Sequence, residues 1–310
     1  MASEEGRTRH LGLDLGATNV KWAVLERASD GWSILERGQF PTASSDGADA
    51  VIGRMGDQAE RARDAWPDLS TIGIGVPGLY DADQGIGTFL PNLPPDWERR
   101  PLAGPMRARL GLPVRLINDA RAFGLAELRL GAGRGCDTMV GLALGTGVGG
   151  VVVMGGEVHF GHKGTGGELG HQTLLPNGPL CTCGNLGCLE AFAKADAVAA
   201  ACGTATAEEA VAAAQAGHER AVAGLADVGR WLGIGISNLI VILTPDRVVL
   251  GGGVSGAGDL LVEPIRDEVR RRVHVTDLDA LEIVTAELGT WAGAIGAGIN
   301  GAAVAAGVPA

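Results

Sequence analysis

The chain has 310 residues, of which 46% are hydrophobic and 20% charged, and its formal net charge is −11. This length corresponds to about two domains, and the composition is that of a globular protein. Because the sequence contains no block rich in Lys and Arg, we expect no nucleic-acid partner. The polar start resembles no secretory signal, and the longest apolar run, over residues 232–243, is interrupted and too short to cross a bilayer. We therefore expect a cytoplasmic protein with no membrane partner.

The first part of the chain predicts an antiparallel meander followed by helices and strands. We expect strands over residues 10–16, 21–26, 32–40, 71–76 and 113–117, and helices over about 48–65, 101–110 and 120–128. Residues 79–96 predict a long irregular stretch, and long loops in compact domains often bind ligands.

The turn over residues 14–19 ends the first expected strand and has two interpretations. Its small residues would let backbone N–H groups approach a phosphate, with the Thr18 hydroxyl as a further donor. Asp14 at the strand end could hold a magnesium ion that keeps most of its water. The alternative is an ordinary hairpin turn.

Two further polar positions also have two interpretations each. Asn92 is either a reader of a substrate hydroxyl or part of an Asx turn. Asp119 follows Asn118 at the end of an expected strand. It is either the N-cap of the next helix or a carboxylate at the carboxyl edge of an α/β sheet, where such sheets place their chemistry. The residues alone leave these alternatives open.

The second part of the chain repeats the strand, glycine turn, strand pattern. A strand expected over residues 139–144 is followed by the turn 145–150 and a strand over 151–154. No Lys-Ser/Thr pair follows and no helix begins there, so this is neither a Walker loop nor a Rossmann fingerprint. Two such units predict two similar halves that embrace one phosphate chain. The remaining expected elements are helices over residues 189–201, 207–243, 259–272 and 291–306 and strands over 247–250 and 281–288.

Cys181, Cys183 and Cys188 lie close together in the sequence, and His171 precedes them. Three thiolates and one imidazole complete the tetrahedral shell of a zinc ion, which leaves no open position and makes the metal structural. The alternatives are a disulfide or free buried thiols. Cys181 and Cys183 are separated by one residue, which is a poor spacing for an unstrained bridge. Zinc is therefore the favoured interpretation.

Taken together, these motifs resemble the ROK family (repressors, open reading frames and sugar kinases), over nearly the whole chain. They follow the family's order: Asp14-Leu-Gly-Ala-Thr18, Pro91-Asn-Leu-Pro94, Asn118-Asp119, Gly145-Thr-Gly-Val-Gly-Gly150, Gly167-Glu-Leu-Gly-His171, Cys181-x-Cys-Gly-x-x-Gly-Cys188-x-Glu190 and Gly251-Gly-Gly253. Each glycine turn is a weak signal, whereas the cysteine motif joined to Gly-Glu-x-Gly-His is specific.

The resemblance implies an α/β fold of the two-lobed actin/hexokinase-like ATPase (ribonuclease H-like) class with a structural zinc site. The small lobe would comprise residues 1–118 and the C-terminal helix over about residues 291–310. The large lobe would comprise residues 119–290 and carry the zinc motif.

The resemblance also implies ATP-dependent phosphorylation of a hexose hydroxyl, with Asp119 as general base. Sugar hydroxyls would be contacted by Asn92, Asn118, Asp119, Glu168, His171 and Glu190. ATP phosphates would be held by Gly16, Thr18, Lys21, Gly145, Thr146 and Gly147, with Asp14 near Mg²⁺, and the adenosine would lie against Gly251, Gly252 and Gly253. Structural Zn²⁺ would be bound by His171, Cys181, Cys183 and Cys188. Because Glu168 and His171 are spaced i, i+3, a helical turn would put them on one face. His171 could then offer one ring nitrogen to zinc and the other to a sugar hydroxyl.

The segment Pro-Asn-Leu-Pro-x-x-Trp looks most like the glucokinase branch, so glucose is the expected substrate. The alternatives are fructose, mannose, an N-acetylhexosamine or kanosamine, or a sugar-sensing regulator without catalysis. Repressors of the family carry an N-terminal winged helix-turn-helix, whereas only about nine residues precede the first expected strand. Polyphosphate-dependent relatives typically lack the cysteine motif, which favours ATP. Relatives are commonly dimers or tetramers, so a homodimer or homotetramer is expected.

Overall fold

A computed structural model describes residues 7–91 and 93–305 of the chain, and the side chains up to residue 303. The chain forms two compact units. The first runs up to residue 130 and takes up the chain again from residue 290, and the second comprises residues 131–289. The lobe boundary expected after residue 118 stays a prediction. The compact units differ from it mainly by helix α3 (Asp119–Leu130), which packs against helix α9 (Ala292–Ala305) in the first unit.

The first unit is built on a five-stranded sheet of order β3-β2-β1-β4-β7. Its strands are β1 (Thr8–Leu15), β2 (Asn19–Ala28), β3 (Gly31–Pro41), β4 (Leu69–Val76) and β7 (Val114–Asn118). The first three form the expected antiparallel meander, and β4 and β7 continue the sheet parallel to β1. The carboxyl ends of β1, β4 and β7 therefore meet at one edge.

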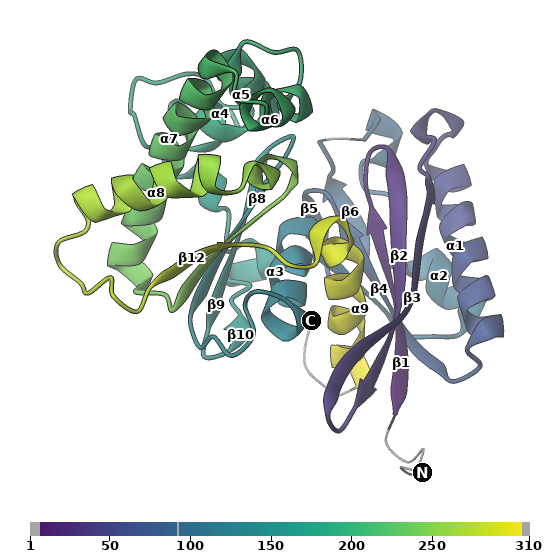
Figure 1. Ribbon diagram of the computed structural model, residues 1–310. Helices are drawn as coiled ribbons and strands as arrows, with labels where there is room; N and C mark the ends of the chain where they lie inside the picture. Colours follow the sequence, from purple (N-terminus) through teal and green to yellow (C-terminus); the bar gives the residue numbers. More distant parts are fainter. Residues whose placement is uncertain (1–6, 92, 306–310) are drawn as a thin grey trace. The chain divides into compact units, whose positions relative to one another are not determined.

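Helices cover both faces of this sheet (Figure 1). On one face, α1 (Ala48–Ala65) and α2 (Ala103–Leu110) pack against the apolar side chains that the strands present at alternate positions. On the other face, α9 approaches β1 and β4 closely. A Cβ atom at Gly12 or Gly73 would lie 1.8 Å or 1.7 Å from a carbonyl oxygen of α9. Only glycine at these two positions allows the helix to lie so close to the sheet.

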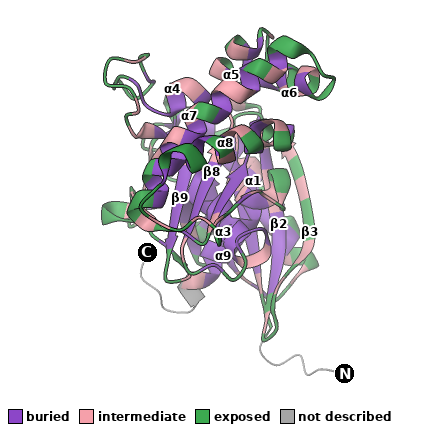
Figure 2. Ribbon diagram, turned by 60° about the vertical axis from the view of Figure 1, so that its left-hand side comes forward, coloured by how far each residue is buried: buried purple, intermediate pink, exposed green. Residues whose placement is uncertain are grey.

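The second unit repeats this design with a sheet of order β10-β9-β8-β11-β12. Its strands are β8 (Met139–Leu144), β9 (Val148–Met154), β10 (Glu157–Val158), β11 (Arg247–Gly251) and β12 (Glu282–Thr285). Again an antiparallel meander is followed by two strands parallel to the first. The prediction of two similar halves is thus confirmed at the level of strand order. Figure 2 shows that the central strands are buried, whereas β3 is largely exposed.

Helices α4 (Glu190–Ala193), α5 (Ala195–Cys202), α6 (Ala207–Gln215), α7 (Glu219–Leu243) and α8 (Asp259–Arg272) complete the second unit. Helix α7 has 25 residues and is long and apolar enough to span a membrane by length and composition alone. It packs against α5, α6 and α8, and more than half of its most apolar window is buried. These contacts are those of a core helix.

Four expectations about local structure were wrong. The helix expected over residues 189–201 is two helices, α4 and α5, because Lys194 between them has an extended backbone. The stretch expected to be irregular contains a hairpin of β5 (Leu79–Asp81) and β6 (Ile86–Phe89). The helix expected over residues 207–243 is two helices, because Gly217 adopts a left-handed φ of 82° that ends α6. The last strand spans four residues rather than eight.

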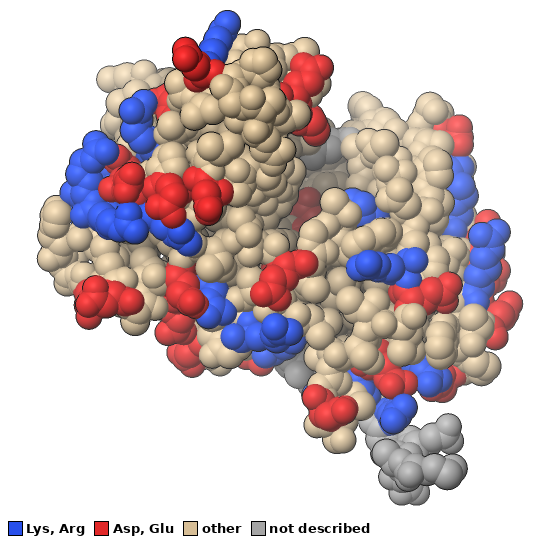
Figure 3. Space-filling view, in the orientation of Figure 1, with Lys and Arg blue, Asp and Glu red and all other residues tan. Residues whose placement is uncertain are grey.

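The visible face in Figure 3 carries acidic and basic side chains mixed together, with no large patch of one sign. On α8 the mixture consists of ion pairs between neighbouring turns, such as Arg270 with Asp267 at 2.9 Å. Such exposed pairs favour solubility more than they add stability.

Candidate active site and metal centre

Asp14 and Asp119 lie at the carboxyl edge of the first sheet. Asp14 is the penultimate residue of β1 and pairs in register with Gly75 of β4, whose next residue, Val76, pairs with Asn118 of β7. Asp119 follows Asn118 directly and begins α3. In open α/β sheets this edge is where ligands bind, so the two carboxyl groups stand where chemistry is expected.

The electrostatic environment of Asp14 favours its protonated form. Burial, and to a smaller extent the negative charge of Asp119, raise the pKa of Asp14 from 3.8 to about 7. Lys21, its partner on β2 in the antiparallel register, acts in the opposite direction. A cation placed beside Asp14 would relieve this cost, as expected for a carboxylate near a magnesium ion.

We expect the stability of the magnesium-free protein to fall between about pH 4 and about pH 7 because of Asp14. Across this range the folded protein holds a proton that the unfolded chain releases, so the free energy of unfolding declines with rising pH, by ~2–4 kcal/mol. Asp14→Asn should remove most of this decline, and Asp30→Asn, at an exposed turn, should not. Urea unfolding at several pH values measures the effect, and an unchanged profile for the Asp14 variant would contradict the assignment.

Helix α3 is capped by Asn118 as well as by Asp119. The Asn118 Oδ1 atom accepts the N–H groups of Ala120 and Arg121 at 3.0 and 3.2 Å, and its Nδ2 donates to the Gly78 carbonyl at 3.1 Å. Asp119 Oδ1 also accepts the Ala120 N–H at 2.8 Å, which orients the carboxylate. Asn118 is buried and Asp119 is half-buried. The cap therefore does not depend on Asp119, and the sugar contact expected of Asn118 stays a prediction.

The turn between β1 and β2 has the open donors of a phosphate cradle. Gly16 N–H bonds to the Asn19 carbonyl at 3.1 Å. The hydroxyl of Thr42 donates to the Gly16 carbonyl at 2.6 Å, and the Thr42 N–H donates to the Thr18 carbonyl at 2.8 Å. Among the described residues, the N–H groups of Ala17 and Thr18 donate to no backbone carbonyl, and both residues are exposed. Thr42 is a supporting residue that no motif in the sequence identifies.

The glycine turn (residues 145–147) stands in the same place in the second sheet, between β8 and β9. Gly145 N–H bonds to the Gly147 carbonyl at 2.9 Å. In the described part of the chain, the N–H groups of Thr146 and Gly147 have no backbone acceptor. Gly252, with φ 86°, packs on the backbone of Leu144. A Cβ added at this position would lie 2.2 Å from the Leu144 carbonyl oxygen. The structure thus brings Gly252 beside the strand end that leads into the glycine turn, and the adenosine contact expected of residues 251–253 stays a prediction.

The four predicted zinc ligands come together in one cluster. The ligand atoms of His171, Cys181, Cys183 and Cys188 all lie within 4.8 Å of one another. The Cys183 and Cys188 sulfur atoms are 3.8 Å apart, and Cys181 Sγ lies 3.6 Å from His171 Nδ1. In a tetrahedral zinc site, sulfur atoms lie about 3.8 Å apart and sulfur and nitrogen about 3.6 Å. The cluster therefore fits zinc, and the sulfur separation excludes a disulfide between Cys183 and Cys188.

The thiols of this cluster have contrasting environments. Burial raises the pKa of the Cys181 thiol to about 12, whereas the backbone N–H of Asn185 lowers the pKa of Cys183. A bound zinc ion would hold all three sulfurs as thiolates. The donor set is soft and complete, which suits a structural role.

Nδ1 is the His171 nitrogen that faces Cys181 Sγ, at 3.6 Å, so it is the one that would bind zinc, and Nε2 would remain for another partner. The expected helical turn is present in a tight form, because His171 N–H bonds to the Glu168 carbonyl at 3.1 Å. This loop lies against β9, since a Cβ at Gly170 would come within 2.0 Å of the Val148 carbonyl oxygen. Glu168 is exposed and Glu190 is buried.

The Glu190 carboxylate is held by several hydrogen bonds. Burial raises its pKa, but the bonds from Val148 N–H at 2.9 Å and from the Thr182 hydroxyl at 2.8 Å outweigh burial, so that the net pKa lies below its usual value. The carboxylate is therefore ionised and firmly oriented.

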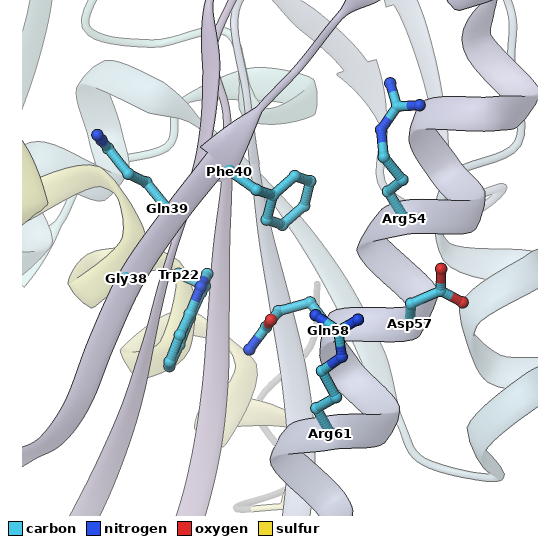
Figure 4. Close-up of a pocket in the computed structure, with 8 residues that line it drawn as sticks. All are labelled: Trp22, Gly38, Gln39, Phe40, Arg54, Asp57, Gln58 and Arg61. Atoms are coloured by element: carbon cyan, nitrogen blue, oxygen red, sulfur yellow. The ribbon is translucent and has the colours of Figure 1, made fainter.

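One predicted site residue and one cavity remain to be described. Asn92 lies outside the described residues. A cavity of about 330 Å³ between β3 and α1 contains none of the predicted site residues (Figure 4). It is lined by Trp22, Gly38, Gln39, Phe40, Arg54, Asp57, Gln58 and Arg61.

The chain has two sheets with the same strand order, and each sheet has a glycine-rich turn after its first strand. Together with the cysteine-histidine cluster, these are the features of the ROK-family kinase fold. The model of the ROK family matches residues 10–300. The chain belongs to the ROK family.

Several relatives match over almost the whole chain. The glucokinase of Thermotoga maritima is 36% identical over 93% of this chain and 95% of its own length. The crystal structure of a ROK hexokinase from Thermus thermophilus has a TM-score of 0.83 and 34% identity over 97% of this chain and 100% of that one. A ROK glucokinase from Streptomyces griseus, solved with glucose and AMPPNP, has a TM-score of 0.78 and 30% identity over 96% and 99%. The xylose repressor of Bacillus subtilis is 31% identical over 74% of this chain and 60% of its own length.

Proposed function

We propose that this protein transfers the terminal phosphoryl group of ATP to a hydroxyl group of a hexose, with glucose as the first candidate and glucose 6-phosphate as the product. The observation that carries the proposal is the carboxyl edge of the first sheet, where Asp119 is oriented by the α3 backbone and lies near Asp14. Full-length similarity to glucokinases supports the choice of reaction and of glucose.

Asp119 acts as the general base in this proposal. Its carboxylate takes the proton of the attacking sugar hydroxyl, most simply O6, as that oxygen bonds to the γ-phosphorus and the ADP oxygen leaves. Asn118 and Asn92 would contact neighbouring hydroxyls. Phosphoryl transfer depends mainly on positioning and charge stabilisation, so the base supplies only part of the acceleration, typically ~10²–10⁴-fold.

The turns supply the phosphate contacts. Backbone N–H groups of residues 16–18, the Thr18 hydroxyl and Lys21 in the first unit, and residues 145–147 in the second, would bind phosphate oxygens. Asp14 would lie near the magnesium ion, which neutralises phosphate charge when it accompanies ATP. Residues 251–253 would lie against the adenosine. Glu168, His171 and Glu190 would bind sugar hydroxyls, with His171 fixed by zinc through its other nitrogen.

A sugar-binding regulator is the second candidate, because the family also contains the xylose repressor. A regulator needs the sugar contacts but no base and no phosphate cradle. Asp119 and both turns favour the kinase. Another hexose or an amino sugar such as kanosamine would use the same residues, since a single hydroxyl changes binding by only a few kcal/mol.

The test is ADP release with ATP and Mg²⁺ against glucose, fructose, mannose, N-acetylhexosamines and kanosamine, with polyphosphate as an alternative donor. We expect ATP-dependent turnover with glucose preferred. If no sugar is turned over but one raises the melting temperature, the protein is a sugar sensor. If another sugar is preferred by kcat/KM, the reaction class stands and the glucose assignment fails.

A further inference from the structure

Glu190 connects the zinc-binding segment (residues 171–190) to the glycine turn, because one of its carboxylate oxygens accepts a hydrogen bond from this segment and the other accepts one from the residue after the turn. Oε2 accepts the N–H of Val148, the residue that directly follows the turn, at 2.9 Å. Oε1 accepts the hydroxyl of Thr182 at 2.8 Å and lies 3.4 Å from Cys181 Sγ. Thr182 stands between two of the predicted zinc ligands. Because Glu190 is only 8% exposed, water competes little for these bonds.

Glu190, at the end of the zinc-binding segment, and Ala195, shortly after it, hold the glycine turn at both ends. Glu190 holds its C-terminal end, and Ala195, the first residue of α5, donates its N–H to the Gly145 carbonyl at 2.8 Å. Glu190 also packs tightly here, because a Cβ at Gly147 would lie 2.5 Å from its Oε2. Residues 190–195 therefore help to hold the turn in shape, and they follow the cysteine cluster directly in the chain.

We propose that Glu190 is a positioning residue that couples the zinc cluster to the glycine turn, so that zinc and nucleotide strengthen each other's binding. The nucleotide part rests on the proposed function, whereas the coupling of the cluster to the turn does not. Linkage is reciprocal: a factor by which zinc tightens nucleotide binding is the factor by which nucleotide tightens zinc binding. This role is compatible with a sugar contact, since a carboxylate has about four acceptor sites.

Two threonines of the zinc-binding segment make a matched pair for the test. Thr182→Val removes the hydroxyl that reaches Glu190 and leaves the Val148 bond and all four predicted zinc ligands in place. Thr173→Val removes a hydroxyl that accepts a hydrogen bond from Asn185 at 2.9 Å and has no bond to Glu190. Both threonines are exposed, so neither substitution should prevent folding.

Hydrogen exchange of the Val148 amide tests the coupling without nucleotide. In the zinc-loaded protein, Thr182→Val should speed this exchange about fivefold, the equivalent of one net hydrogen bond, and Thr173→Val should not. Equal exchange in the two variants would overturn the inference.

Zinc transfer to a chelator tests the nucleotide part. In the unaltered protein, saturating Mg²⁺ and AMPPNP without sugar should tighten zinc binding at least about fivefold in equilibrium competition with the chelator, the lower end of typical couplings. Thr182→Val should reduce this effect to less than about twofold and raise KM for ATP but not for sugar, while Thr173→Val keeps it. If AMPPNP binds and zinc affinity does not change, the inference fails. If AMPPNP does not bind at all, the proposed function fails, and the amide exchange still decides the coupling.

Discussion

Asp119→Ala is expected to abolish measurable turnover while the protein still binds sugar. Removal of a general base typically costs ~10²–10⁴-fold, and the shortened side chain also leaves a gap beside the reacting hydroxyl. The fold should survive, because Asn118 continues to cap α3 with both of its bonds to the helix. Steady-state kinetics and calorimetric titration with the sugar measure the two effects separately.

Asp83→Ala is the matched control, since Asp83 is an exposed carboxylate outside the site. Its kcat/KM should stay within about twofold of the unaltered protein. Asp119→Asn adds an electrostatic check: without the Asp119 charge the pKa of Asp14 should fall, because that charge helps to raise it. Activity within about tenfold of the unaltered protein after Asp119→Ala would exclude Asp119 as the base.

Periodicity was sufficient to predict most elements of the fold. The helix over residues 48–65 and the strand over residues 139–144 occur at the expected bounds, because each has a regular apolar pattern and a clear end. The break at Gly217 was missed, because alanine-rich sequence on both sides favours helix and the single glycine is a weak signal against it. The hairpin β5–β6 was missed because its strands of three and four residues are too short for alternation to show.

The site was predictable where chemistry depends on residue type and less so where it depends on shape. The spacing of the cysteines and the presence of His171 predict the cysteine-histidine cluster from the sequence alone. By contrast, Thr42 and Thr182 support the two turns through contacts that only the folded backbone creates. Asn118 and Asp119 show the same limit. Adjacent polar residues after a strand do not reveal which of them satisfies the helix and which remains for catalysis.

Loss of the metal is expected to destabilise the second unit strongly. Cys188 is fully buried, so Cys188→Ser removes one ligand and leaves a polar group in a closed site. We expect a loss of ~4 kcal/mol or more, which would lower the melting temperature by roughly 8–16 °C for a unit of this size. Zinc affinity should also fall as pH falls, because the thiols must lose their protons to bind, and burial makes this hardest for Cys181.

Cys136→Ser provides the control, because Cys136 is likewise buried but lies outside the cluster. It should retain one zinc per chain and lose at most ~1–2 kcal/mol, whereas Cys188→Ser should lose zinc, stability and protection of residues 171–190 from proteolysis together. Metal content, thermal unfolding and limited proteolysis of both variants test this. A purified, unaltered protein that contains no zinc and is equally stable with and without a chelator would refute the structural metal. It would also remove the physical basis for coupling the cysteine cluster to the glycine turn, since residues 190–195 would then be held by protein contacts alone.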